Sequence, residues 1–120
     1  MAEPSAGTRL SIRIDLSNGD RIGPGKVALL EAIRAQGSIS GAARALGMSY
    51  RRAWLLVEEI NQSLTRPAVT AEMGGRSGGG AYVTPVGEQI VGLYRTIESR
   101  ARTAAGGEFR ALGKLTRPAK

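Results

Sequence analysis

The stretch "GSISGAARALGMSYRRAW", residues 37–54, decides the fold of this 120-residue chain. Each of its two helix-breaking glycines, Gly37 and Gly47, is followed within two residues by a serine, Ser38 and Ser49. Glycine often ends a helix because it adopts the left-handed conformation at little cost, and serine often begins the next helix by accepting a backbone hydrogen bond. The stretch therefore predicts one short helix between Ser38 and Gly47 and another helix after Ser49. Two helices joined by a tight glycine turn are typical of a helix-turn-helix.

Apolar residues recur with helical spacing on both sides of this turn, which indicates the faces that pack together. Ala43, four residues before Gly47, is small enough to let the two helices approach closely. A further helix is predicted before them, over residues 24–36, with Gly37 at its end. The predicted buried residues of the three helices are, in order, Val27, Leu29, Leu30 and Ile33; Ile39, Ala42, Ala43 and Leu46; and Ala53, Val57, Ile60 and Leu64.

Strands are predicted on both sides of these helices. Residues 9–16, "RLSIRIDL", alternate between apolar and polar, which is typical of a half-buried strand. The segments "AVTAEM" at 68–73 and "AYVT" at 81–84 flank the glycine-rich "GGRSGGG" at 74–80 and predict a β-hairpin with a flexible tip.

A long last helix is predicted to start at Thr84, which can cap it, and Pro85, which suits its first position. Its predicted buried stripe is Val86, Ile90, Leu93 and Ile97, and its pattern fades from residue 102. The expected fold class is therefore mainly α with a small β-hairpin (α+β): a winged helix-turn-helix with an N-terminal strand and a long C-terminal helix. Residues 9–104 form the expected domain, between a disordered tail at 1–8 and a basic tail at 105–120.

Composition excludes most enzyme classes. The chain has no histidine and no cysteine, which removes the common zinc sites, cysteine nucleophiles and serine–histidine triads. The glycine-rich loop has no lysine where a P-loop requires one, and the adjacent Glu58 and Glu59 point in different directions on a helix. We expect no enzyme, no cofactor and no metal. No apolar run approaches the ~20 residues of a membrane span and no secretory signal begins the chain, so a cytoplasmic, nucleoid-associated location is expected.

The net charge of +7 indicates double-stranded DNA as the partner. The helix after Ser49 presents Tyr50, Arg51 and Arg52 in its first turn, where a recognition helix meets base edges. Arginine can bind guanine through two hydrogen bonds, and Ser49 at a helix N-terminus suits a phosphate. Negative charge at Glu58 and Glu59 marks the end of the DNA-facing part. Trp54, one residue off the inward stripe, is expected to be a core anchor.

The hairpin that follows a recognition helix is the wing of such a domain, and its tip lies near the DNA backbone or minor groove. Arg76 supplies charge there and Ser77 can donate to a phosphate, while glycines allow close approach. Ser38 and Ser40, at the start of the short helix, are also predicted to contact DNA. Three alternatives stay open: a non-specific architectural DNA-binding protein, a winged helix that docks another regulator, and a helical hairpin with no DNA role.

Three segments together resemble the N-terminal DNA-binding domain of the molybdate-responsive regulator family ModE: residues 37–54, "EEIN" at 58–61, and "GGRSGGGAYVTPVGEQIVGLY" at 74–94. The resemblance covers about residues 10–104. It implies binding to an inverted repeat as a homodimer, with the first strand and helix and the last helix at the dimer interface. The expected interface residues are Leu10, Ile12, Val91, Tyr94 and Ile97.

The chain ends before the molybdate-binding domains that follow in that family, so molybdate sensing is not carried over. Three explanations are open: the ligand domain is absent in nature, the sequence has been cut, or a separate effector-sensing protein supplies control. A start at Met1 and an end without a tag favour a complete short protein.

Overall fold

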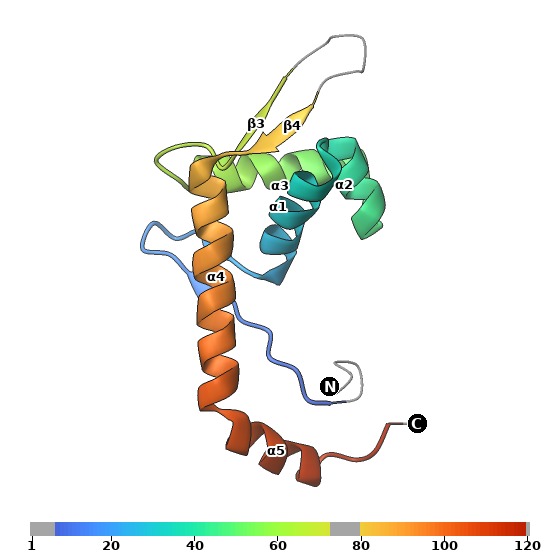
Figure 1. Ribbon diagram of the computed structural model, residues 1–120, viewed down its shortest axis with the longest axis vertical. Helices are drawn as coiled ribbons and strands as arrows, with labels where there is room; N and C mark the ends of the chain where they lie inside the picture. Colours follow the sequence, from blue (N-terminus) through green and yellow to red (C-terminus); the bar gives the residue numbers. More distant parts are fainter. Residues whose placement is uncertain (1–6, 73–79, 120) are drawn as a thin grey trace.

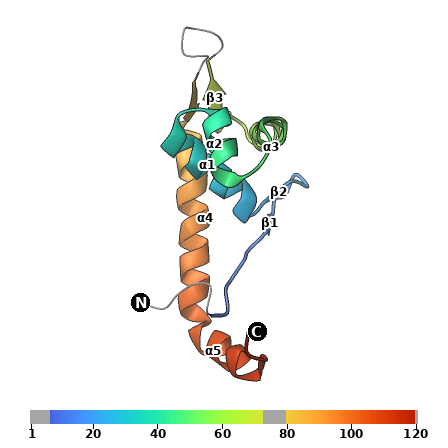
Figure 2. The same cartoon turned by 90° about the vertical axis from the view of Figure 1, so that its right-hand side faces the viewer.

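The computed structural model describes residues 7–72 and 80–119 and has the winged helix-turn-helix architecture (Figure 1). The expected fold class is confirmed. Helices α1–α3 form one unit, the hairpin β3–β4 stands beside α3, and α4 runs down one side to α5 (Figures 1 and 2). The elements in chain order are β1 (Ile14–Asp15), β2 (Arg21–Ile22), α1 (Pro24–Gln36), α2 (Ile39–Leu46), α3 (Tyr50–Gln62), β3 (Val69–Ala71), β4 (Ala81–Val83), α4 (Pro85–Ala104) and α5 (Gly106–Leu115).

The predicted stops and caps set the helix boundaries. Gly37 and Gly47 follow α1 and α2 in the left-handed conformation, with φ of 74° and 69°. The side chains of Ser38, Ser49 and Thr84 each accept a hydrogen bond from the backbone N–H three residues on, at the starts of α2, α3 and α4. These local signals are sufficient to place the turn between the two helices of the helix-turn-helix.

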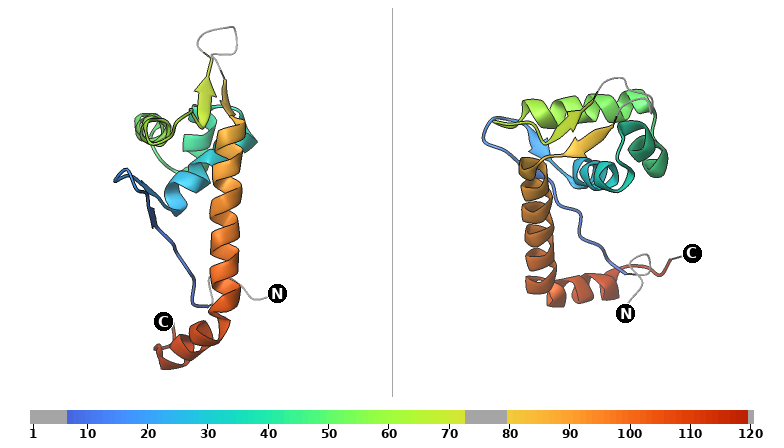
Figure 3. Two further views of the ribbon diagram at one scale, coloured as in Figure 1. Left: turned by 90° about the vertical axis from the view of Figure 1, so that its left-hand side faces the viewer. Right: turned by 45° about the horizontal axis from the view of Figure 1, so that its top comes forward.

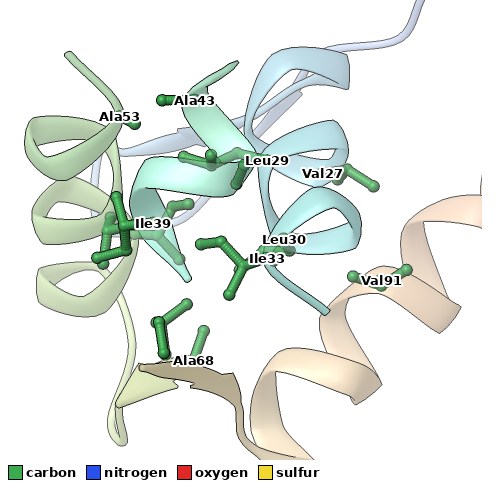
Figure 4. Close-up of a cluster of buried hydrophobic side chains, with 14 of the residues drawn as sticks. Val27, Leu29, Leu30, Ile33, Ile39, Ala43, Ala53, Ala68 and Val91 are labelled. Atoms are coloured by element: carbon green, nitrogen blue, oxygen red, sulfur yellow. The ribbon is translucent and has the colours of Figure 1, made fainter. Parts of the chain in front are cut away.

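The core forms around α1, whose apolar residues meet every other element of the unit (Figure 4). Val27, Leu29, Leu30 and Ile33 are each at most 1% exposed. The facing residues Ala43 of α2 and Ala53 of α3 are small, which allows the helices to approach closely. Leu46 is 38% exposed and is the one residue of the predicted α2 stripe that does not join the core.

The wing packs tightly against the start of α4. β3 and β4 are antiparallel, with Val69 opposite Val83 and Ala71 opposite Ala81. A Cβ atom at Gly87 would lie 2.4 Å from the carbonyl oxygen of Ala68, so no larger residue fits there without movement. The base of the wing is thereby fixed to α4.

The predicted N-terminal strand is much shorter than expected. Only residues 14–15 are in a strand, paired with 21–22 across a turn. The alternation over residues 9–16 is present in the burial pattern, because the apolar positions are half-buried and the polar ones exposed. A third strand to extend the ladder is absent from the described residues. Of the tail predicted at 1–8, residues 1–6 lie outside the described part of the chain.

The predicted buried stripe of α4 is wrong in its second half, whereas Val86 and Ile90 are half-buried and Ile90 packs against the core. Leu93 is 57% and Ile97 is 44% exposed, whereas Gly87, Val91 and Tyr94 are the buried residues of this helix. The two sets lie on neighbouring sides, about 100° apart, because successive helix residues are rotated by that angle. The Tyr94 hydroxyl donates to the carbonyl of Ile12 at 2.6 Å, which allows a polar aromatic residue to be buried where leucine was expected.

The segment predicted as a basic tail contains α5, which has no buried residue. It leaves α4 at a steep angle at the end remote from the wing (Figures 1 and 3). The molecule measures 54 × 34 × 23 Å with a radius of gyration of 16.9 Å, whereas a compact chain of this length has about 14 Å. The second half of α4 and α5 therefore project from the core.

Candidate DNA-binding surface

The polar residues in the first turn of α3 are exposed to solvent. Tyr50 is 56% exposed, and Arg51 and Arg52 are also exposed. The Ser49 hydroxyl accepts from the Arg52 N–H at 3.1 Å, which satisfies one of the free N–H groups of the helix start. Ser49, Tyr50, Arg51 and Arg52 are therefore all exposed at the start of α3, and their contact with DNA stays a prediction.

The two adjacent arginines face different surroundings. Arg51 lines an open depression together with Tyr50, Trp54 and Leu55. Arg52 lines a separate depression on the side of α3 that faces the start of α1, and the other residues of that depression are Arg13, Arg21, Gly23, Pro24, Gly25, Lys26, Met48 and Leu56. No ion pair between described residues involves either arginine. Both charges are thus available to an anionic partner, at two different places.

Trp54 is not the core anchor that the sequence predicted. It is 43% exposed and lies with Leu55, which is 47% exposed, on the outer side of α3. The inner side is occupied by Ala53, Val57 and Ile60, which are at most 6% exposed. A bulky indole does not fit where α3 packs closely on α1 and α2.

The two serines at the start of α2 have different environments. The Ser38 hydroxyl accepts from the Gly41 N–H at 2.9 Å and is half-buried, so its hydrogen bond capacity is partly used by the cap. Ser40 is exposed, and its hydroxyl lies 3.5 Å from that of Ser38. Contact of either residue with DNA stays a prediction.

Asn61, near the end of α3, joins the recognition helix to the wing. Its side-chain oxygen accepts from the N–H groups of Ala68 at 2.8 Å and Val69 at 3.2 Å, and its amide donates to the Val69 carbonyl at 3.0 Å. Sequence reasoning used the surrounding "EEIN" only as part of a resemblance and missed this role. An asparagine at the end of a helix, eight residues before a strand, was the available signal.

Two backbone hydrogen bonds place the other strand of the wing. The Ala81 N–H donates to the Gly37 carbonyl at 3.0 Å, and the Thr84 N–H donates to the Ala68 carbonyl at 2.9 Å. The wing is therefore held by the turn between α1 and α2 as well as by α3. The predicted contacts Arg76 and Ser77 lie outside the described residues.

An ion-pair cluster holds α4 against α1. Arg95 donates two hydrogen bonds to the Glu31 carboxylate, at 2.7 and 3.0 Å, and another to Glu98 at 2.9 Å. The hydrogen bonds from Arg95 hold the pKa of Glu31 below its ordinary value, and the two carboxylates raise the pKa of Arg95. Burial raises the pKa of the Tyr94 hydroxyl beside them. This cluster fixes the first part of α4 against α1.

The residues predicted for the dimer interface divide into two groups. Val91 and Tyr94 are 5% and 2% exposed within this chain's own core, so their assignment to an intermolecular surface is wrong. Both residues lie off the predicted stripe of α4, on the side of the helix that the structure buries. Ile97 is exposed, and Leu10 and Ile12 are half-buried; their place in an interface stays a prediction.

Groups of three or more side chains able to hold a metal ion are absent from residues 7–72 and 80–119. Within the same residues, the helices are too short or too polar to cross a membrane.

The fold and the exposed start of α3 define the DNA-binding class of winged helix-turn-helix proteins. The full-length LTTR LysG from Corynebacterium glutamicum is similar over 73% of this chain and 29% of that one, with a TM-score of 0.53 and 25% identity. No protein-family model matches the chain.

Within that class, the chain is similar in sequence to molybdenum-related regulators of ModE type, and the expected resemblance is confirmed. The molybdenum-pterin-binding protein MopB of Rhodobacter capsulatus is 51% identical over 81 residues, which are 68% of this chain and 30% of MopB. The DNA-binding transcriptional dual regulator ModE of Escherichia coli is 39% identical over 71 residues, which are 59% of this chain and 27% of that regulator. The chain spans less than a third of the length of each.

Proposed function

We propose that this chain is a transcriptional regulator of ModE type that binds an inverted DNA repeat as a homodimer, in the control of genes related to molybdenum or another oxyanion. The observation that carries the proposal is the exposed first turn of α3, with Tyr50, Arg51 and Arg52, on a helix whose other end is tied to the wing through Asn61. The net charge of +7 favours an anionic partner. Such a role places the protein in the cytoplasm, on the nucleoid.

The first test is a selection of bound sequences from random duplex DNA at physiological salt, with and without molybdate. Enrichment of an inverted repeat with half-sites about one helical turn (~34 Å) apart is the expected result. Recovery of DNA without an enriched sequence would favour a non-specific architectural role. Binding that requires an added protein would favour a partner-dependent winged helix.

Arg51 is the residue whose loss should change sequence preference most. Arg51→Ala is expected to cost about 1–3 kcal/mol of binding free energy at one base position, the value of a two-hydrogen-bond contact to guanine. The matched control is Arg117→Ala, which removes another exposed charge, beyond the end of α5. Equal losses in the two variants at every sequence would show that Arg51 contributes only general charge.

The homodimer is supported by the projecting, uncovered part of the chain. Leu93 and Ile97 lie one turn apart on the outer side of α4, and Leu112 and Leu115 of α5 are 54% and 85% exposed. A ten-residue helix such as α5 is marginal in water without packing, so it requires a surface to cover its apolar side. A second copy of the chain supplies an equal apolar surface, as a twofold dimer requires.

Leu93→Glu with Ile97→Glu should convert a dimer to a monomer in light-scattering or sedimentation measurements, because each places a charge in the apolar contact. Ser99→Glu, on another exposed side of α4, is the matched control. A dimer that persists in the double variant would place the interface elsewhere.

A further inference from the structure

The outer side of α3 carries an apolar surface beside one arginine. Tyr50 and Trp54 lie four residues apart, and so do Arg51 and Leu55, so all four side chains share one side of the helix. They line a single open depression. The three apolar members are between 43% and 56% exposed, so the folding of this chain does not use these surfaces fully.

The position of this surface on α3 favours a base-reading role. A recognition helix meets base edges with its N-terminal turns, and these residues occupy the first six positions of α3. Only one group on the major-groove edge of a base pair is apolar, the C5-methyl of thymine, and apolar side chains contact it.

The charge at this surface also favours the major groove of DNA as its partner. Arg51 lines the depression itself. A positive charge beside an apolar centre complements a groove whose walls are phosphates and whose floor carries methyl groups. Glu58, one turn beyond Trp54, ends the complementary region because its carboxylate would repel the phosphates.

Resting on the proposed function, we propose that Trp54 and Leu55 read thymine through its methyl group, one turn along α3 from the base pair that Arg51 contacts. Each half-site then contains one or two thymines whose methyl groups are required. Tyr50, at the first position of the helix, borders the same depression on the side of Arg51.

The test uses the full 120-residue chain and the duplex enriched in the selection experiment. Each thymine is replaced in turn by deoxyuridine, which removes the methyl group and keeps the base pair. Wild type should lose about fourfold in affinity at each contacted thymine, the value of one buried methyl group. In Trp54→Ala or Leu55→Ala the ratio of thymine to uracil affinity at that position should fall to about one, because the contact is absent.

Two controls make the ratio specific. Uracil in the spacer between half-sites should have no effect on wild type, and Ser99→Ala, at an exposed position of α4 outside the proposed dimer contact, should keep the wild-type ratio. Far-ultraviolet circular dichroism checks that each variant is folded, which is expected since the side chains are exposed.

The outcomes separate the two proposals. An enriched site without a uracil penalty, or a penalty unchanged in both α3 variants, would overturn the thymine contact and leave the regulator intact. Equal weakening of the thymine and uracil duplexes by Trp54→Ala would likewise overturn the thymine contact and leave the regulator intact. Absence of any enriched site would overturn both proposals together.

Discussion

Replacement of Asn61 by alanine tests whether one side chain sets the geometry between recognition helix and wing. Its three hydrogen bonds reach the backbone of Ala68 and Val69, which are 0% and 3% exposed. In Asn61→Ala, the N–H groups of Ala68 and Val69 lose their acceptor and the Val69 carbonyl loses its donor. Water has little access to these buried backbone groups and cannot readily replace the lost side chain. At about 1 kcal/mol for each lost bond, with a larger penalty for buried groups left unsatisfied, the expected loss of unfolding free energy is about 2–4 kcal/mol.

For a chain of this length that loss corresponds to a fall in Tm of about 8–16 °C. The assay is urea and thermal denaturation, and the matched control is Gln62→Ala, at the exposed neighbouring position. DNA affinity should fall more in Asn61→Ala than in Gln62→Ala under conditions where both are folded, because the wing loses its fixed position. If the two variants agree within about 0.5 kcal/mol, the hydrogen bonds of Asn61 do not hold the wing.

Three further predictions concern α4 and its ion pair with α1. Gly87→Ala should destabilise the protein by about 1–3 kcal/mol or more, because its Cβ would meet the Ala68 backbone, whereas Gly92→Ala, with open space around it, should stabilise by about 0.5–1 kcal/mol in denaturation. Because the pKa of Glu31 is lowered in the folded state, its pairing with Arg95 stabilises the protein above the ordinary carboxyl pKa, and this stabilisation is lost as the pH falls through the folded value. The difference in unfolding free energy between wild type and Glu31→Gln, measured in urea from pH 7 to pH 3, should therefore shrink below about pH 4.5. A difference that stays constant with pH would refute the linkage. Arg95→Ala should reduce this pH dependence to the level of Glu31→Gln, since the same pair is removed.

Local chemistry made the helix boundaries predictable. Gly37, Gly47, Ser38 and Ser49 act within three or four residues, through left-handed backbone and side-chain caps, so their effect can be read without the rest of the fold. The hairpin β3–β4 is equally local. These signals are sufficient to identify the helix-turn-helix, the wing and the exposed first turn of α3.

The faces of α4 were not predictable in the same way, because the helix carries two apolar sides. Leu93 and Ile97 form the more hydrophobic side, and periodicity assigns that side to the core. The core instead takes Val91 and Tyr94, since the Tyr94 hydroxyl reaches the Ile12 carbonyl and Arg95 beside it reaches Glu31. Ile12 and Glu31, which lie 82 and 64 residues earlier in the sequence than Tyr94 and Arg95, therefore decide which side of α4 is buried. The apolar periodicity of α4 carries no information about these distant partners.

Trp54 shows the same limit within the candidate site. Its size favours burial in general, but α3 packs on α1 and α2 through Ala53, and only small side chains fit at that distance. An indole next to this alanine in the sequence is therefore turned about 100° away from the contact, to the outer side where Arg51 also lies. Adjacent Arg52 is turned by a similar angle in the other direction, into a different depression. The proposed base preference thus depends on the side of the helix on which each residue lies. The sequence "YRRAW" divides into an outer set of Tyr50, Arg51 and Trp54, a flanking Arg52 and a buried Ala53.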